Sequence, residues 1–175
     1  MSDPNIEAVY PLSPTQEGML FHTLYEEGSQ VYFQQLTFSL EGPLDAGAFA
    51  RAWRIATQRH AILRTVFLWD RQKKPLQVVR RSVSPDWREE DWTARTEPGG
   101  DEALEAFLEV DRRIAFEPSK VPPVRYSLIK LAPTRHHFVW SFHHLLLDGW
   151  SVALLLREVQ EAYHALRRGA EPTLA

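Results

Sequence analysis

The side chains best suited to chemistry lie in residues 142–151. This segment reads Phe-His-His-Leu-Leu-Leu-Asp-Gly-Trp-Ser and contains the pattern His-His-x-x-x-Asp-Gly at His143, His144, Asp148 and Gly149. With the composition of this chain, the pattern would arise by chance in roughly one chain in a thousand. An imidazole titrates near neutral pH and can accept a proton from an amine or an alcohol nucleophile. The two histidines are therefore the candidate bases.

The aspartate and the glycine of the pattern suggest how such a base would be used. Asp148 is close enough in sequence to organise the loop or to reach an arginine. Gly149 lets the backbone approach closely, and its N–H would lie at a helix N-terminus, where negative charge is favoured. A base beside an oxyanion donor is what acyl transfer requires. Taken singly, a His-His pair is usually structural and an Asp-Gly is usually a cap, so only the combination predicts catalysis.

Two other kinds of site are disfavoured. The histidines at 136, 137, 143 and 144 fall in adjacent pairs on predicted strands, where neighbouring side chains point to opposite faces. The chain has no cysteine and no His-Glu-x-x-His, so we predict no metal site. It also has no Gly-x-Ser-x-Gly, which disfavours a Ser-His-Asp triad.

Composition narrows the class of protein. The chain has 175 residues, 44% of them hydrophobic, and suits a single globular unit. Its net charge of -3 argues against a nucleic-acid partner. No apolar run reaches the length of about 20 residues that a membrane span needs, and the first residues do not resemble a signal peptide. We therefore expect a cytoplasmic protein that does not enter a membrane.

Helices and strands are predicted to alternate along the chain, which indicates a mixed α/β class. The helices are expected at residues 14–26, 46–59, 101–114 and 149–168, the second capped by Asp45 and the third with Ile114 among its inward residues. The strands are expected at residues 31–40, 63–69, 76–79, 124–131 and 136–142. Residues 80–100 are polar and contain prolines and glycines, so we predict an irregular surface segment there.

Three segments together resemble the condensation domains of nonribosomal peptide synthetases. They are residues 10–22 (Tyr-Pro-Leu-Ser-Pro-Thr-Gln-Glu-Gly-Met-Leu-Phe-His), residues 59–67 (Arg-His-Ala-Ile-Leu-Arg-Thr-Val-Phe) and residues 143–151. The family fold resembles chloramphenicol acetyltransferase, with two lobes in a V and the active site between them. The resemblance implies that residues 1–168 form the N-terminal lobe, a mixed sheet flanked by helices, and that residues 169–175 are a linker or a truncation end. The bridging and latch motifs of the second lobe are absent from this sequence.

The resemblance also implies a role for each residue of the pattern. The family joins a carrier-bound donor thioester to the α-amine of a carrier-bound acceptor. His144 would be the catalytic histidine, and His143 would support the loop. Asp148 would be structural and would pair with an arginine that can come from the second lobe. Gly149 would leave room for the acceptor arm.

Further expectations follow from the other two segments. Arg59 and Arg64 match the second segment, and we expect them to stabilise the fold through ion pairs. The sequence of the first segment is similar to that of the condensation-domain subtype that joins two L-residues. The implied partners are the donor and acceptor peptidyl carrier domains, whose phosphopantetheine arms bring the substrates, and the C-terminal lobe. No cofactor is expected to be bound by this chain itself.

Three functions remain open from the sequence. The first is a lobe of a peptide-bond-forming domain, inactive when isolated. The second is a stand-alone acyltransferase of the same superfamily that acts on a small alcohol or amine. The third is a non-catalytic module that docks a carrier domain or a neighbouring protein. A lone lobe would expose an apolar face, so self-association is expected.

Overall fold

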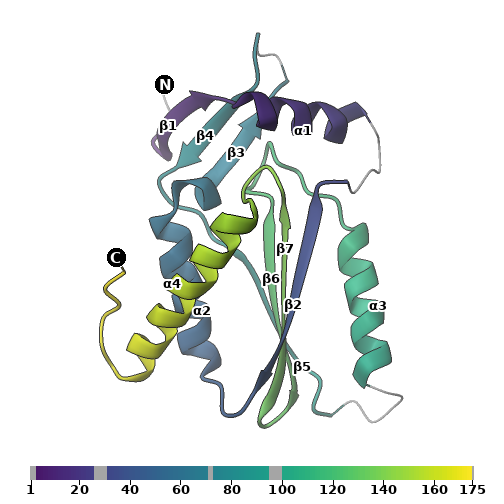
Figure 1. Ribbon diagram of the computed structural model, residues 1–175, viewed down its shortest axis with the longest axis vertical. Coiled ribbons are helices and arrows are strands. Elements are labelled where there is room, and N and C mark those ends of the chain that lie inside the picture. Colours follow the sequence, from purple (N-terminus) through teal and green to yellow (C-terminus); the bar gives the residue numbers. More distant parts are fainter. Residues whose placement is uncertain (1–2, 26–30, 71–72, 95–99, 175) are drawn as a thin grey trace.

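The computed structural model describes residues 3–25, 31–70, 73–94 and 100–174. In these ranges the chain forms two sheets and a set of helices (Figure 1). The elements in chain order are β1 (Ile6–Pro11), α1 (Pro14–Tyr25), β2 (Phe33–Glu41), α2 (Ala46–Arg59), a 3-10 turn (Ala61–Arg64), β3 (Thr65–Leu68), β4 (Leu76–Arg80), β5 (Asp86–Asp91), α3 (Gly100–Arg113), β6 (Val124–Ala132), β7 (Arg135–His143) and α4 (Gly149–Arg167). The predicted mixed α/β class, with sheets flanked by helices, is confirmed.

The larger sheet has the strand order β2-β7-β6-β5. β2 and β6 each run antiparallel to β7, whereas β5 is parallel to β6. Helices α2 and α4 cover one face of this sheet and α3 covers the other (Figure 1). Because successive side chains of a strand point to opposite faces, β7 sends Phe138 and Trp140 toward α2 and α4 and sends Val139 and Ser141 toward α3.

Aromatic side chains fill the space between the sheet and α2. Trp53 is only 1% exposed, and its ring centroid lies 4.9 Å from that of Tyr126 and 4.9 Å from that of Trp140. Trp53 belongs to helix α2, which Asp45 caps as predicted, with its Oδ1 accepting the Ala48 N–H at 2.9 Å. Burial of such large apolar rings is the main favourable contribution to folding on this face.

Helix α3 is held to the opposite face by a buried ion pair. Asp111 and Arg125 are 4% and 5% exposed, and Arg125 Nε donates to Asp111 Oδ1 at 3.0 Å. The second carboxylate oxygen accepts from Gln35 Nε2 at 2.9 Å and from the Ser141 hydroxyl. The Arg125 guanidinium also lies 4.2 Å from the centroid of the Phe116 ring. Each charge is thus compensated by a partner and by further contacts. A buried ion pair without such compensation would destabilise the fold.

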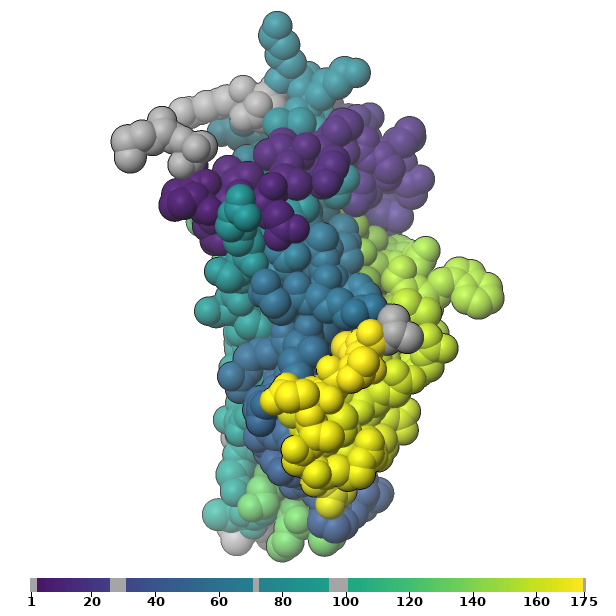
Figure 2. Space-filling model, turned by 90° about the vertical axis from the view of Figure 1, so that its left-hand side faces the viewer, coloured from purple at the N-terminus to yellow at the C-terminus, as the bar shows by residue number. Residues whose placement is uncertain are grey.

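The smaller sheet has the order β1-β4-β3 and lies beyond one end of the larger sheet, with α1 crossing beside it (Figure 1). The C-terminal segment returns over α2 (Figure 2). There the carbonyl of Leu174 accepts a hydrogen bond from Arg59 Nη1 at 3.3 Å. No helix in the described ranges is both long and apolar enough to cross a membrane.

One prediction about the fold is wrong. Residues 80–100 are not an irregular surface segment, because β5 lies within them and pairs with β6. Trp92, directly after β5, is 6% exposed and packs against α3. The polar sequence concealed this strand because β5 is an edge strand whose other side chains are largely exposed. The part of the segment at residues 95–99 lies outside the described residues.

Element boundaries differ from the predictions in smaller ways. Strand β1 was not predicted, and the start of the strand expected at residues 63–69 is a 3-10 turn. Ile114, expected to point inward from α3, lies just after the helix and is 40% exposed. Its N–H bonds back to the Asp111 carbonyl at 3.2 Å in the last turn. The predicted helix end at residue 26 lies outside the described residues.

The buried pair predicts a large difference between two arginine substitutions on this face. Arg125→Ala leaves the Asp111 carboxylate buried without its cation, so the free energy of unfolding should fall by about 3 to 5 kcal/mol. Arg113→Ala removes an arginine whose side chain is 72% exposed in its pair with Glu109, and the change should stay below about 0.5 kcal/mol. Urea unfolding at neutral pH measures both. Equal losses for the two variants would contradict the assigned importance of the buried pair.

Candidate active site

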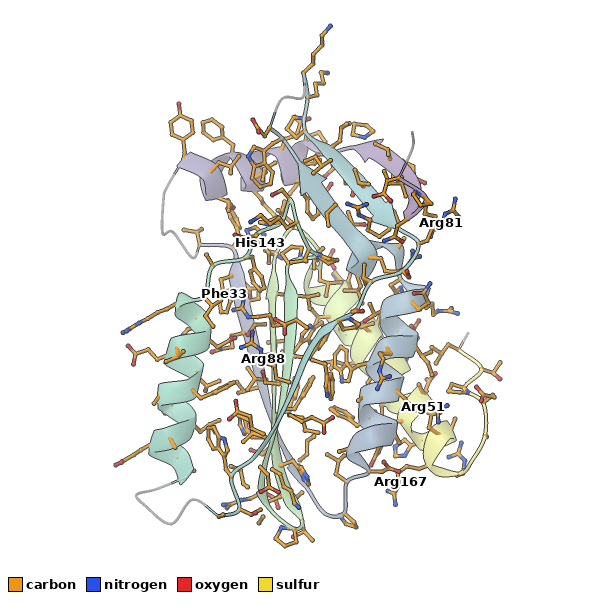
Figure 3. The ribbon with its side chains drawn as sticks, turned by 180° about the vertical axis from the view of Figure 1, so that it is seen from behind. Phe33, Arg51, Arg81, Arg88, His143 and Arg167 are labelled. Atoms are coloured by element: carbon orange, nitrogen blue, oxygen red, sulfur yellow. The ribbon has the colours of Figure 1, made fainter. Side chains whose placement is uncertain are left out.

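The histidine pattern lies at the end of β7 that faces α1. His143 is the last residue of the strand, and Figure 3 places its side chain close under α1, above Phe33. Residues 143–148, named the histidine loop below, connect β7 to the first turn of α4. The backbone enters this loop under restraint, because His143 N–H bonds to the Pro123 carbonyl at 2.9 Å and His144 N–H bonds to the Tyr32 carbonyl at 2.8 Å.

The imidazole of His143 is buried and both of its nitrogens are used. Its Nδ1 accepts the Leu145 N–H at 3.1 Å, so the proton of the neutral ring is on Nε2. Nε2 lies 3.1 Å from the hydroxyl oxygen of Thr23, which in turn donates to the Met19 carbonyl at 2.8 Å. Burial, followed by the nearby His144, lowers the pKa of His143 from 6.5 to about 4. His143 is therefore neutral and fixed at physiological pH.

The imidazole of His144 carries its proton on the other ring nitrogen, Nδ1. Its Nδ1 lies 2.5 Å from the Leu147 carbonyl oxygen, which can only accept, so Nδ1 carries the proton. In the neutral ring Nε2 then presents a lone pair, and within the described residues it has no hydrogen-bond partner. The residue is half-buried, so this nitrogen is not sealed from a substrate. A neutral ring with a free Nε2 is the form that can accept a proton.

The three residues between the histidines and the aspartate anchor the loop in the core. Leu145, Leu146 and Leu147 are 3%, 6% and 5% exposed and belong to the main hydrophobic cluster. The Leu146 N–H also bonds to the His143 carbonyl at 3.0 Å and forms a turn. Because these side chains are buried, the Leu147 carbonyl that orients His144 is held by packing.

Asp148 and Gly149 begin α4. Asp148 is exposed, and its Oδ1 accepts the Ser151 N–H at 2.8 Å as an N-cap. The backbone hydrogen bond from Ser151, above all, lowers the pKa of Asp148. A Cβ on Gly149 would meet nothing within 4 Å, so this chain leaves open space beside that residue. The next residue, Trp150, is 88% exposed.

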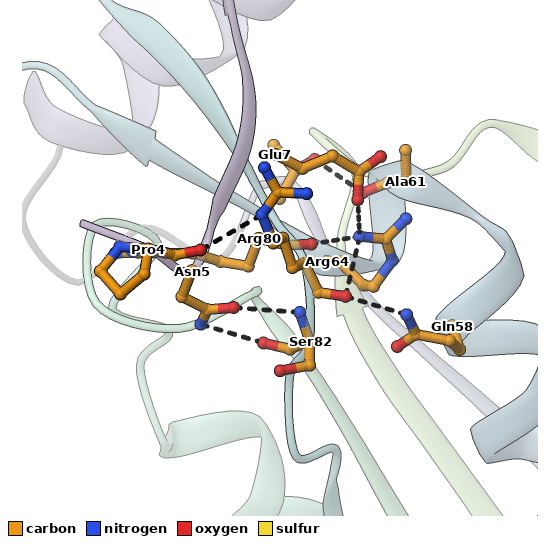
Figure 4. Close-up of polar contacts among 10 residues, drawn as sticks. Pro4, Asn5, Glu7, Gln58, Ala61, Arg64, Arg80 and Ser82 are labelled. Atoms are coloured by element: carbon orange, nitrogen blue, oxygen red, sulfur yellow. Dashed lines mark hydrogen bonds and ion pairs between the residues drawn. The ribbon is translucent and has the colours of Figure 1, made fainter. Parts of the chain in front are cut away.

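Arg59 and Arg64 make their ion pairs with residues outside the histidine loop. Arg64 is 5% exposed and donates to Glu7 at 2.7 Å and to the carbonyl of Arg80, which ties the 3-10 turn to the smaller sheet (Figure 4). Arg59 Nε lies 3.6 Å from the buried carboxylate of Glu158 on α4. Both arginines thus form ion pairs within the described fold, and their contribution to its stability stays a prediction.

The structure adds two side chains that the sequence did not assign to the site, Gln16 and Thr23 of α1. Gln16 Nε2 donates to the Leu145 carbonyl at 3.2 Å, and Thr23 contacts His143. Gln16 also takes part in the cap of α1, with its Oε1 accepting the Ser13 N–H at 3.0 Å. No local pattern could reveal the second contact, because it spans 129 residues.

These contacts define what the site can do. A fixed neutral imidazole supports a loop, and the loop leaves the Nε2 of a second imidazole without a partner near the start of a helix. Such a group can accept a proton from a nucleophile or orient it for attack.

Comparison with known proteins assigns the family. A family model described as Condensation domain matches residues 6–175. One of the linear gramicidin synthase proteins of Brevibacillus parabrevis is 45% identical over 163 residues, covering 93% of this chain and 2% of that protein. One of the plipastatin synthase proteins of Bacillus subtilis (strain 168) is 37% identical over 171 residues, covering 98% of this chain and 7% of that protein. The chain thus spans only a small part of the length of these relatives.

Solved structures agree with the sequence relatives. The starter condensation domain of rhizomide synthetase superposes with a TM-score of 0.84 at 26% identity, covering 97% of this chain and 42% of that chain. The first condensation domain of the calcium-dependent antibiotic synthetase, in complex with substrate analogue 2a, has the same fold, with a TM-score of 0.81 at 22% identity and 40% of its length covered. The resemblance seen in the three sequence segments is therefore confirmed, and this chain belongs to the condensation-domain family of nonribosomal peptide synthetases.

Proposed function

We propose that this chain is the histidine-bearing N-terminal lobe of a domain that forms peptide bonds between carrier-bound substrates. The observation that carries the proposal is the orientation of His144, whose protonated Nδ1 is bonded to the Leu147 carbonyl so that Nε2 is free. The lobe comprises residues 1–168, followed by a short tail at residues 169–175. We expect it to act in the cytoplasm.

In the proposed reaction the α-amino nitrogen of the acceptor attacks the thioester carbonyl carbon of the donor. A C–N bond forms and the C–S bond breaks. His144 Nε2 accepts or orients the proton of the amine, which then passes to the departing sulfur so that it leaves as a thiol. An α-amino group titrates near pH 8 (about 7.7 to 8.0), so a weak base is sufficient, and alignment of the two tethered substrates supplies much of the rate.

The proposed role of His143 is to support the loop without reacting. Its lowered pKa keeps it neutral, and both of its nitrogens are used within the chain. A charged His143 would lose the bond from Leu145 N–H, because a protonated Nδ1 cannot accept. In this proposal His143 has a structural role and His144 is the reactive residue.

The exposed side of α4 supports a lobe that works with a partner. The Asp148 carboxylate is exposed, the space next to Gly149 is open, and Trp150 and Leu154 are 88% and 48% exposed. We propose that the second lobe of the complete domain covers this face and offers an arginine to Asp148. In the isolated chain the same apolar side chains favour self-association.

The remaining parts of the proposal rest on the sequence segments. The substrates arrive on the phosphopantetheine arms of donor and acceptor peptidyl carrier domains, and the first segment favours the joining of two L-residues. This chain would bind no cofactor of its own. The alternatives are a stand-alone acyltransferase and a non-catalytic docking module, and reconstitution separates them.

Replacing His144 tests the catalytic assignment. In a domain completed with a matching second lobe and supplied with loaded carrier proteins, His144→Ala should lower the rate of peptide formation by about a hundredfold or more. The matched control is His164→Ala, which removes an exposed histidine of α4 and should leave the rate unchanged. Mass spectrometry of the carrier-bound product measures both.

Three results would overturn parts of this proposal. An undiminished rate in His144→Ala would remove His144 from the chemistry. Peptide formed by this chain alone would contradict its incompleteness. No peptide from the unaltered completed domain would leave the docking module as the better function.

Replacing Asp148 separates its role as a cap from its role as a charge. Asp148→Ser keeps a capping oxygen, so the midpoint of thermal unfolding of this chain should hardly change, whereas Asp148→Ala should lower it. In the completed domain Asp148→Ser should still slow peptide formation, because the arginine of the second lobe loses its anion. Asp45→Ser, at the equivalent cap of α2, should have neither effect. A fully active Asp148→Ser domain would reduce Asp148 to a cap.

The titration of His143 tests its burial. In the folded chain its ring carbon resonances should titrate with a pKa of about 4, and in the urea-unfolded chain near 6.5. Because the unfolded state binds a proton at higher pH than the folded state, this residue should reduce the free energy of unfolding as the pH falls from 6.5 toward 4. His143→Asn should lose that part of the acid sensitivity. A folded-state titration near 6.5 would contradict the assigned neutral, buried ring.

A further inference from the structure

Helix α1 contacts the histidine loop through one face. Gln16 and Thr23 are two helical turns apart and therefore lie on the same side of α1. Gln16 Nε2 donates to the Leu145 carbonyl at 3.2 Å, and Thr23 Oγ1 lies 3.1 Å from His143 Nε2. The helix thus holds the loop at two points, one on its backbone and one on the supporting imidazole.

Each of these side chains is itself fixed within α1. Gln16 and Ser13 form a reciprocal cap, in which Ser13 Oγ accepts the Gln16 N–H at 3.2 Å and Gln16 Oε1 accepts the Ser13 N–H at 3.0 Å. The amide group of Gln16 therefore has its oxygen in the cap and its nitrogen on the loop. The Thr23 hydroxyl donates to the Met19 carbonyl, so its oxygen is the acceptor for His143. Both contacts have a defined direction.

The two contacts connect to His144 through a short series of bonds. Thr23 keeps the proton of His143 on Nε2, which leaves Nδ1 free to accept the Leu145 N–H. Gln16 holds the carbonyl of that same leucine. The loop then continues to the Leu147 carbonyl, which binds Nδ1–H of His144 and leaves its Nε2 without a partner.

The backbone of the two histidines does not depend on α1. His143 and His144 are held by the carbonyls of Pro123 and Tyr32, which lie in other parts of the fold. Loss of the α1 contacts should therefore leave β7 in place and disturb the loop beyond it. The effect should be on the direction of the His144 ring rather than on folding.

We propose that Gln16 and Thr23 are positioning residues that set the tautomer of His143 and, through residues 145–147, the direction of His144 Nε2. This inference rests on the proposed function of His144. It gives a role at the site to Gln16 of the first sequence segment and to Thr23, the residue directly after that segment, although neither side chain touches the reacting atoms.

The test uses substitutions that keep α1 and its cap. Gln16→Glu preserves the capping oxygen but has no N–H to donate to Leu145. Thr23→Val has nearly the same shape but no oxygen for His143, and Thr23→Ser restores the oxygen. Thr15→Val makes the same chemical change at an exposed threonine of the same helix and is the matched control.

Nitrogen NMR of the imidazole rings in the 175-residue chain is the first measurement. The unaltered chain should show His143 with its proton on Nε2 and His144 with its proton on Nδ1. Thr23→Val and Gln16→Glu should shift His144 toward a mixture of tautomers, with thermal unfolding close to that of Thr15→Val. Thr23→Ser should resemble the unaltered chain. Unchanged histidine tautomers in both altered chains would overturn the inference, whatever their activity.

Kinetics of the completed domain are the second measurement. Thr23→Val and Gln16→Glu should each lower kcat about tenfold, with little change in the KM for the acceptor carrier, because alignment is lost rather than binding. Thr23→Ser should recover most of the rate, and Thr15→Val should retain it. If Thr15→Val lowered kcat equally, or if the decrease in kcat among the variants paralleled their decrease in thermal stability, the role of Gln16 and Thr23 would be merely structural. Failure of the unaltered domain to form peptide would instead reject the proposed function. The NMR measurement of the histidine tautomers would then still test whether Gln16 and Thr23 position His144.

Discussion

The alternation of side chains along β7 is the constraint on which the rest of the structure depends. Phe138, Trp140 and Phe142 all point into the aromatic core beneath α2 and α4. Ser141 and His143 must then point to the other face, where Ser141 meets the buried aspartate of α3 and His143 meets α1. A shift of the β7 register by one residue would exchange the two faces. The same register therefore determines both the packing of the core and the position of His143.

The fold buries polar groups on this second face in two different ways. The Asp111 carboxylate is matched by the guanidinium of Arg125 and by hydrogen bonds. His143 is instead kept neutral, because an imidazole loses its proton at little cost near pH 7 and burial favours that form. The first solution ties α3 to the sheet. The second gives the loop a rigid support whose two nitrogens have different, fixed roles.

The three family segments take separate places in the structure. The first contains most of α1 and meets the third at the histidine loop through Gln16, while Thr23, the residue directly after that segment, contacts His143. The arginines of the second make ion pairs in other parts of the fold, where Arg64 joins the 3-10 turn to the smaller sheet and Arg59 joins α2 to α4. The three segments belong to one family pattern, but the structure gives them different places. The first contacts the histidine loop, whereas the arginines of the second form their ion pairs outside it.

The sequence by itself determined the family, the mixed α/β class, most helices and strands, and the candidate histidines, because these depend on local periodicity, caps and a rare short pattern. It could not reveal β5, whose exposed edge looks polar, or the outward position of Ile114. Only the tertiary structure decided which nitrogen of each histidine carries the proton. That choice depends on partners brought together from distant parts of the chain, as with Thr23 for His143, and on the carbonyl of Leu147 held in place by core packing.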